Sequence, residues 1–343
     1  MMNKSIEIII AGRRQRRRRW IVVTTSLAAL LFVLCCAMLL LGNTIYPVKD
    51  VMLALLGYEL KGVSFAVNSI RLPRMLAGFF AGIAFGIGGN TFQTMLRNPL
   101  ANPNVIGITT GSSAAAVFCI VILHTSESIV SIASIIAGLA TVLFIYLFSK
   151  GKSFSIGRII LVGIGIQAML NAAISYILLV GAQQDIPSAL RWLTGSLNGA
   201  QMHELPPLVI FVVIFAPIII LLGKHLSILE LGEQSATSLG LNTDKTRIIL
   251  IISAVFILAL ATATTGPIAF VAFLAGPIAK RLVGVGFSNV IPAGLVGANL
   301  VLASDLIGQF AFDVRYPVGI ITGIIGAPYL IYLLIRMNQK GEL

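Results

Sequence analysis

Asp305 is the residue whose type and position could do chemistry within an apolar environment. It lies near one end of the apolar run 290–308. A carboxyl group at such a depth is costly to ionise, and gradient-driven transporters use residues of this kind to carry protons or ions. The same carboxylate could equally cap a helix or pair with a nearby loop group. The residues alone leave both interpretations open.

The other residue types that perform chemistry lack the spacing they need. Gly151, Lys152 and Ser153 resemble the end of a phosphate-binding loop, but Tyr146 stands where that loop requires an earlier glycine. The histidines and cysteines are scattered along the chain, at His124, His203, His225, Cys35, Cys36 and Cys119. If the apolar runs cross a membrane, no Ser/His/Asp group and no pair of carboxylates falls together on one side of it. We therefore expect no catalytic residue, no metal site and no cofactor, and interpret the chain as not being an enzyme.

The composition indicates a membrane protein. Hydrophobic residues make up 57% of the 343 residues and charged residues 10%, whereas soluble domains have about 45–50% and about 25%. A run of about 20 apolar residues crosses the bilayer as a helix. Ten such runs are predicted, at 20–41, 75–95, 105–123, 129–148, 159–180, 208–223, 248–264, 269–285, 290–308 and 317–335. The expected fold is all-α and polytopic, with both termini on one side.

The placement of the positive charge predicts the orientation. A net charge of +12 could indicate nucleic acid binding, but the arginines of 13–19 directly precede the first apolar run. Such clusters orient a span and contact anionic lipid. With the amino terminus inside, the Lys and Arg residues that fall outside are Lys49, Lys61, Arg71, Arg74, Arg191 and Arg315. We therefore place both termini in the cytoplasm, in contact with membrane lipid, and expect no nucleic acid partner.

The chain divides into a basic cytoplasmic tail at 1–19, a single transmembrane domain at 20–336 and a cytoplasmic tail at 337–343. The longest inner polar segment is 224–247. Because no inner segment is longer, an ATPase domain does not fit in this chain. Energy for any transport must come from another chain or from an ion gradient.

The segment 224–247 has the pattern of a docking element. Its apolar residues are expected to form one stripe over two short helical pieces, and they are Leu229, Leu231, Ala236, Leu239 and Leu241. Glu230, Glu233 and Asp244 would stay solvated, while Gly232 and Gly240 allow breaks. The alternative is a surface loop that rests on lipid headgroups. Its acids and few cations argue against anionic lipid.

Small residues in the second span predict close helix packing. Gly78, Gly82 and Gly86 are spaced four apart and share one helix face, where another backbone can approach. This pattern indicates a tightly packed bundle and says little about a substrate.

Two cations precede the second span on its outer side. Arg71 and Arg74 flank Pro73, which suits the first turn of a helix. Exposed, unpaired cations at this position could meet acidic residues of a docking protein. The alternative is that both side chains extend to the membrane interface.

Four blocks of this sequence resemble one family of transport proteins. They are RLPRMLAGFFAGIAFGIGGNTFQTMLRNPLANPNVIGITTGSSAAA at 71–116, RWLTGSLNG at 191–199, LELGEQSATSLGLN at 229–242 and YPVGIITGIIGAPYLIYLLIR at 316–336. They resemble the FecCD family, the permease subunits of type II ABC importers for iron-siderophore complexes, haem and vitamin B12. The resemblance is greatest to iron-siderophore permeases.

That resemblance implies a ten-helix permease in a bacterial cell membrane that works with two ATP-binding subunits, a second permease and an extracytoplasmic binding protein. It implies ATPase coupling at Leu231, Gly232, Glu233, Ala236, Leu239 and Gly240. It implies binding-protein docking at Arg71 and Arg74, and an inner gate at Asn98, Leu100 and Ser155.

One departure from the family concerns the run from Gly266 to Leu282, GPIAFVAFLAGPIAKRL, in which Ile278 follows Pro277. Many relatives that work as homodimers have Pro-His there, so this variant resembles the subunit type that pairs with a non-identical partner. The rival hypothesis is an ion-gradient-driven transporter or channel that uses Asp305.

Overall fold

The structure is a computed structural model that describes residues 2–101, 107–150, 156–284 and 286–339. The described part is helical, with no strand. Its α-helices are α1 Met2–Leu40, α2 Val48–Leu55, α3 Leu72–Met95, α4 Ile108–Val121, α5 Glu127–Ser149, α6 Ile156–Val180, α7 Ile186–Thr194, α8 Pro206–Leu221, α9 Gly223–Leu229, α10 Glu233–Ser238, α11 Thr243–Thr265, α12 Val271–Val283, α13 Val290–Phe310 and α14 Val318–Gln339. A π-helix, η1 Phe65–Arg71, leads into α3, and a short 3-10 helix, η3 Met202–Glu204, precedes α8.

Each predicted span corresponds to a helix of the described residues, but the predicted number of ten membrane spans is not confirmed. Seven helices in the described ranges are long and apolar enough to cross a membrane, and the pair α8 and α9, bent by 56°, is an eighth candidate. The predicted spans 105–123 and 269–285 correspond to α4 and α12, which have 14 and 13 residues. The chain is thus a multi-pass helical membrane protein with two shorter helices inside the bundle.

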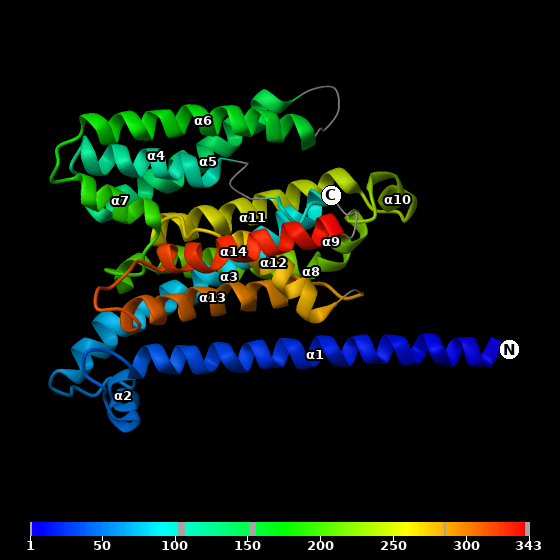
Figure 1. The fold of residues 1–343 in the computed structure, drawn as a ribbon, viewed down its shortest axis with the longest axis horizontal. Coiled ribbons are helices and arrows are strands. Elements are labelled where there is room, and N and C mark those ends of the chain that lie inside the picture. The colour runs from blue at the N-terminus through cyan, green and yellow to red at the C-terminus, as the bar shows by residue number, and fades with distance from the viewer. Residues whose placement is uncertain (1, 102–106, 151–155, 285, 340–343) are drawn as a thin grey trace.

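The helices form three groups around α3 (Figure 1). Helix α3 lies in the centre and packs against α8, α11, α12 and α13. Helices α4, α5, α6 and α7 pack on one another at one side and join the centre through α11. Helix α1 lies on the opposite side, against α13. Helix α3 is also the most central in its burial: of the most hydrophobic 18-residue stretch within Phe65–Met95, 78% is buried inside the protein.

Glycines set the distance between α3 and α13. A Cβ added to Gly82 would lie 2.5 Å from the Cα of Ala298, and one added to Gly86 would overlap the carbonyl oxygen of Ala293. A Cβ at Gly78 would meet the Leu302 side chain at 2.7 Å. The two backbones therefore touch along one face of α3, as small residues permit between membrane helices.

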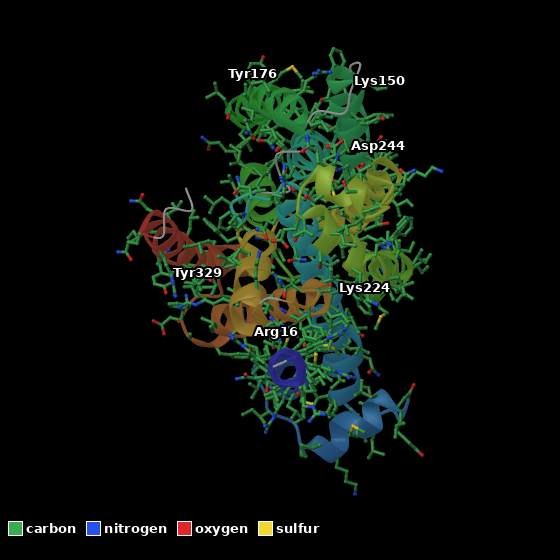
Figure 2. All side chains as sticks on the ribbon, turned by 90° about the vertical axis from the view of Figure 1, so that its right-hand side faces the viewer. Arg16, Lys150, Tyr176, Lys224, Asp244 and Tyr329 are labelled. Carbon is green, nitrogen blue, oxygen red and sulfur yellow. The ribbon has the colours of Figure 1, made fainter. Side chains whose placement is uncertain are left out.

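The first helix is longer than its apolar run and lies at the edge of the bundle. The basic segment 2–19, expected to be a tail, is the first half of α1. Trp20 Nε1 donates to the Ser288 carbonyl at 3.0 Å, and Asn299 Nδ2 donates to the Leu27 carbonyl at 3.0 Å. Seen along its axis in Figure 2, α1 stands beside the bundle with Arg16 at the near end. Only 11% of its most apolar window is buried, as suits a helix in lipid.

Both ends of the chain extend toward the same end of the bundle. The first turn of α1, the last turn of α14 and the short helix α10 lie together at this end, and α2 and α7 lie at the opposite end (Figure 1). Lys150, Lys224 and Asp244 are labelled at the near face in Figure 2, which views the molecule from the α10 end. We call the α10 end the inner end and the α2 end the outer end.

Candidate functional site: the coupling segment and the two ends of the bundle

Residues 224–247, named the coupling segment here after the role that the sequence predicts for them, form a helix–turn–helix projection at the inner end (Figure 1). Leu229 at the end of α9 and Ala236 in α10 are buried in the bundle core, whereas the Leu231 and Leu239 side chains are 63% and 64% exposed. The expectation of one continuous apolar stripe is therefore wrong. Leu229, Ala236 and the partly buried Leu241 fix the segment to the bundle. Leu231 and Leu239 point outward and are free to contact another molecule.

Glycines make the two turns of the coupling segment, as expected. Gly232 has φ 107 and Gly240 has φ 81, values that side-chain-bearing residues rarely adopt. Gly232 ends the turn after α9 and begins α10, and Gly240 follows the end of α10. These turns set the outward direction of Leu231 and Leu239.

Two ion pairs tie the coupling segment to neighbouring helices. Glu233 accepts a hydrogen bond from Arg247 of α11 at 3.1 Å, and the Arg247 side chain is 7% exposed. Glu230 accepts one from Lys280 of α12. Both glutamates are exposed, as the sequence predicted, and each also pairs with a cation of a neighbouring helix.

The inner cavity lies beside the coupling segment and has a volume of about 490 Å³. Its lining residues come from α3, α12, α14 and the segment itself, and they include Asn98 and Glu230. Asn98 Oδ1 accepts from the Leu100 backbone N–H at 2.8 Å, which closes a tight turn after α3. Asn98 and Leu100, two of the predicted gate residues, thus lie at the inner end. Ser155, the third, lies outside the described residues.

Arg71 is not the exposed, unpaired cation that the sequence predicted. Its side chain is 9% exposed, and its guanidinium donates to the carbonyls of Leu39 and Leu40, each at 2.9 Å, and of Thr44 at 2.6 Å. Leu39 and Leu40 end α1, where helix carbonyls lack partners, and Thr44 lies in the loop that follows. A cation at a helix carboxyl terminus is also favoured by the helix dipole. Arg71 therefore fastens the outer end of α1.

Arg74 is likewise paired. It donates from Nε and Nη2 to the two oxygens of Asp305, both at 2.8 Å. Asp305 is 1% exposed and also accepts from Gln309 at 2.7 Å. The alternative that Asp305 pairs with a nearby group is thus confirmed, and the partner is a helix residue rather than a loop residue. The bidentate pair joins α3 to α13.

A second cavity of about 490 Å³ opens at the outer end, between α4, α5, α7 and the end of α11. Its carboxylates include Glu127, Asp185 and Glu204. Burial raises the pKa of Glu204 above its usual value, and the Glu127 carboxylate adds to this, while His203 opposes it. His124 lies 3.4 Å from Asp185. No cluster in the described part of the chain has the His, Cys, Asp and Glu side chains that a metal ion needs.

Comparison with known proteins shows which family the chain belongs to. The FecCD transport family matches residues 30–336. The chain belongs to the FecCD transport family. It is 33% identical over 303 residues, 87% of this chain and 91% of the relative, to the ferric enterobactin transport system permease protein FepG of Escherichia coli (strain K12).

Other members of the family are similar over most of their length. FepD, a permease protein of the same ferric enterobactin system, is 33% identical over 88% of this chain and 91% of its own length. The Fe(3+)-citrate import system permease protein YfmE of Bacillus subtilis (strain 168) is 36% identical over 83% of this chain and 86% of its own. The structure of a metal-chelate type ABC transporter in an inward-facing conformation has a TM-score of 0.82 and 25% identity, and covers 92% of this chain and 100% of that chain.

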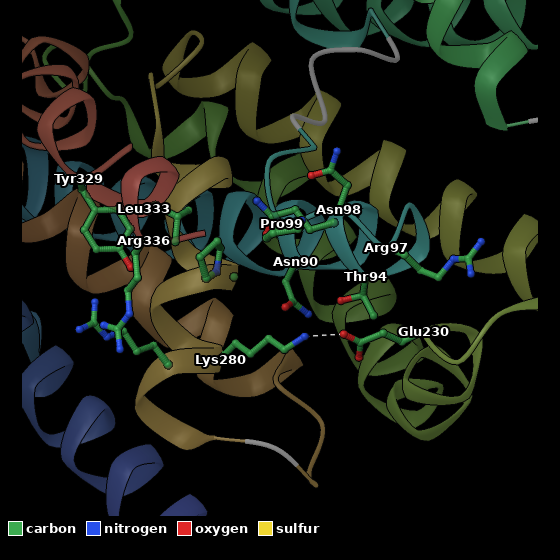
Figure 3. Close-up of a pocket in the computed structure, with 14 residues that line it drawn as sticks. Asn90, Thr94, Arg97, Asn98, Pro99, Glu230, Lys280, Tyr329, Leu333 and Arg336 are labelled. Atoms are coloured by element: carbon green, nitrogen blue, oxygen red, sulfur yellow. Dashed lines mark hydrogen bonds and ion pairs between the residues drawn. The ribbon is translucent and has the colours of Figure 1, made fainter. Parts of the chain in front are cut away.

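Sequence reasoning missed residues that the fold brings to the inner cavity. Lys280 of α12 and Asn90 of α3 both line it (Figure 3), and neither was predicted as a site residue. Asn90 and Gln93 are three residues apart in α3 and are each 5% exposed. Two amides at helical spacing within an apolar span are the signal that could have found them, because polar side chains at such depth are costly unless they have a role.

Proposed function

We propose that this chain is a permease subunit of an ATP-driven importer that moves an iron-siderophore-type chelate across a bacterial cell membrane into the cytoplasm. The FecCD family, and the iron-chelate systems of FepG and YfmE, support this proposal. The observation that carries it is the coupling segment, which presents Leu231 and Leu239 to solvent. Exposed leucines on a segment held in one conformation are typical of a docking surface.

In this proposal the inner end faces the cytoplasm and separate subunits hydrolyse ATP. Each ATP-binding subunit receives a coupling segment in a groove that covers Leu231 and Leu239. Closure of the two ATP-binding subunits moves the segment, and the pairs Glu233–Arg247 and Glu230–Lys280 pass that movement to α11 and α12. The bundle then changes between two states because ATP-bound and nucleotide-free partners bind them with different affinity.

The second permease in this proposal is a non-identical member of the same family. The run from Gly266 to Leu282 supports this, since it departs from the pattern of homodimeric relatives. FepG and FepD, two permease proteins of one system, both match this chain, as subunits of a mixed pair would.

An extracytoplasmic binding protein would dock at the outer end near Arg74. Arg74 also donates to Asn198 of the RWLTGSLNG block, at 3.4 Å. Acidic residues of the partner would have to compete with Asp305 for this guanidinium. Arg71 has no part in this proposal, because its donors are held by the carbonyls of Leu39, Leu40 and Thr44.

Reconstitution tests the function. The chain is co-expressed with the ATP-binding subunit, permease and binding protein encoded beside it, and uptake of ⁵⁵Fe-chelate into proteoliposomes is measured with ATP, with a non-hydrolysable analogue and with an imposed proton gradient. Uptake that needs ATP hydrolysis is the expected result. Uptake driven by the gradient without ATP, and abolished by Asp305→Asn, would establish the rival transporter instead.

A further inference from the structure

The segment 42–71, which joins α1 to α3 at the outer end, carries an apolar stripe that stays exposed in the folded chain. The stripe consists of Val48, Met52 and Leu55 of α2 and of Leu56, which ends that helix. These residues occupy positions i, i+4, i+7 and i+8, which share one side of a helix. Their exposed fractions range from 37% for Leu55 to 72% for Leu56. Contiguous exposed apolar side chains mark contact sites for proteins or membranes.

The segment is fixed to the bundle, so the stripe has a defined place. Val51 and Ala54, on another side of α2, are buried in a small apolar core with residues of η1 and of the end of α1. Asn68 of η1 donates to the Ala54 carbonyl at 3.0 Å, and Arg71 donates to the last carbonyls of α1. These contacts hold α2 against α1. The stripe is therefore exposed on a helix that is itself well packed.

The place of α2 indicates what contacts the stripe. Helix α2 lies next to the outer end of α1, on the side away from the bundle (Figure 1), and the view from the inner end also shows it beyond α1 (Figure 2). Helix α1 faces lipid on its exposed side, where Phe32 and Val33 are 70% and 59% exposed. Lipids that contact α1 at this edge have their outer headgroups at the level of α2. The stripe therefore adjoins the lipid-facing surface of α1.

The residues around the stripe are those of a membrane–water interface. Tyr58 follows α2 and is 62% exposed, and tyrosines are enriched at the level of the lipid headgroups. By helical spacing, Asp50 lies on the side of α2 opposite Met52, and Lys49 borders the stripe. A lysine at such a border keeps its ammonium among the headgroups while its stem contacts apolar groups. A helix with one apolar side and charged flanks is typical of helices that lie in the plane of the interface.

We infer that the segment 42–71 is an interfacial anchor, in which the α2 stripe contacts the acyl chains of phospholipids in the outer leaflet. The inference goes beyond the proposed function, because it concerns a lipid contact and holds for any cargo. The anchor fixes the outer end of α1 at the membrane surface, since Arg71 joins the segment to that helix.

A soluble binding protein fits the stripe less well than lipid does. Such a protein would bind and leave in each transport cycle, and the four apolar side chains would lie in water between two visits, which is unfavourable. Phospholipid covers the stripe at all times. Helix α2 also lies at the edge of the bundle, beyond α1, and not over the central helices around α3 (Figure 1).

Photo-crosslinking tests the anchor in the assembled protein. Met52 is replaced by the photoreactive amino acid p-benzoylphenylalanine, and the chain, assembled with the partners encoded beside it, is irradiated in nanodiscs of phosphatidylcholine with and without the binding protein. Phe32, replaced in the same way, is the lipid-facing reference, and Asp313, an exposed residue between α13 and α14, is the water-exposed reference. Mass spectrometry should find at least about fivefold more phosphatidylcholine adduct at Met52 than at Asp313.

The crosslinked species decide between lipid and protein. An adduct of Met52 with the binding protein or with the second permease would overturn the inference and assign the stripe to that protein. A lipid yield at Met52 no higher than at Asp313, with Phe32 labelled, would overturn it as well, because the stripe would then lie in water. Leu56, replaced in the same way, gives the same decision where the variant at Met52 fails to assemble.

Charge placed on the stripe provides an independent measurement. In Met52→Glu with Leu56→Glu, the affinity of the complex for its binding protein should change by less than about threefold, because the stripe is not part of that interface. A larger loss would show that the stripe is a docking surface and would contradict the anchor. If the unchanged complex shows no ATP-driven uptake, the proposed function fails, while a lipid adduct at Met52 still establishes the anchor.

Discussion

Arg74 of α3 and Asp305 of α13 are joined by two hydrogen bonds of 2.8 Å, 231 residues apart in the chain. Asp305 is 1% exposed and receives a third hydrogen bond from Gln309. The pair therefore closes the outer end of the glycine-lined contact between the same two helices. A carboxylate held by three donors acts as a structural link between α3 and α13.

Breaking this pair should destabilise the protein. Asp305→Asn leaves the Arg74 guanidinium buried without a counter-charge, and we expect a loss of about 3–5 kcal/mol in unfolding free energy, as for other broken buried pairs. Thermal unfolding in detergent measures it. Asp313→Asn, which neutralises an exposed carboxylate in the next loop, should have no effect. The swap Arg74→Asp with Asp305→Arg should recover part of the loss; no recovery would show that the two side chains do not depend on each other.

The close contact between α3 and α13 at Gly86 should not tolerate an added methyl group. Gly86→Ala places a Cβ on the Ala293 carbonyl of α13, so the helices must separate. Overpacking of this kind costs about 1–3 kcal/mol. Gly323→Ala is the matched control in α14, because a Cβ there has no atom within 4 Å. Equal melting temperatures for the two variants would mean that α3 and α13 are less closely packed than described.

Apolar runs predicted where the helices lie, because the length of a membrane helix is set by the bilayer and its composition by lipid. The spacing of Gly78, Gly82 and Gly86 predicted a packing face in the same way. The sequence did not predict that α4 and α12 are short, since a helix end depends on the neighbours that satisfy its backbone. It also did not predict that the basic segment 2–19 would continue α1.

Sequence patterns could not predict which groups each side chain would contact. Arg71 and Arg74 were expected to be free because they stand outside the membrane against the charge rule, and only the fold brings the α1 carbonyls and Asp305 to them. The segment 224–247 has the expected turns at Gly232 and Gly240, but the single apolar stripe was wrong, since helical spacing cannot tell which leucines meet the bundle.

The exposed leucines of the coupling segment should matter for assembly and not for folding. Leu231→Ser with Leu239→Ser should reduce the amount of ATP-binding subunit that co-purifies with the chain by at least about fivefold, as the loss of central interface residues does. The melting temperature should stay unchanged, because both side chains are already in solvent. Leu56→Ser, at an exposed leucine of the outer end, should leave co-purification intact. Unchanged co-purification in the double variant would remove the segment from the interface.

Glu204 should make stability depend on pH at the outer end. Its pKa in the folded chain lies above its usual value because of burial and the Glu127 carboxylate. The folded state therefore binds the proton more tightly than the unfolded state does, and this stabilisation is present at acidic pH and lost as pH rises through the folded pKa. In Glu204→Gln this side chain is neutral at every pH, so the stabilisation is not lost on raising the pH. The variant should therefore melt at a higher temperature than the unchanged chain at about pH 7.5, with little difference at about pH 4. Glu59→Gln, which neutralises an exposed carboxylate on the same side, should give no such gain, and a Glu204→Gln variant that melts lower at neutral pH would show that the charged carboxylate is favoured in the fold.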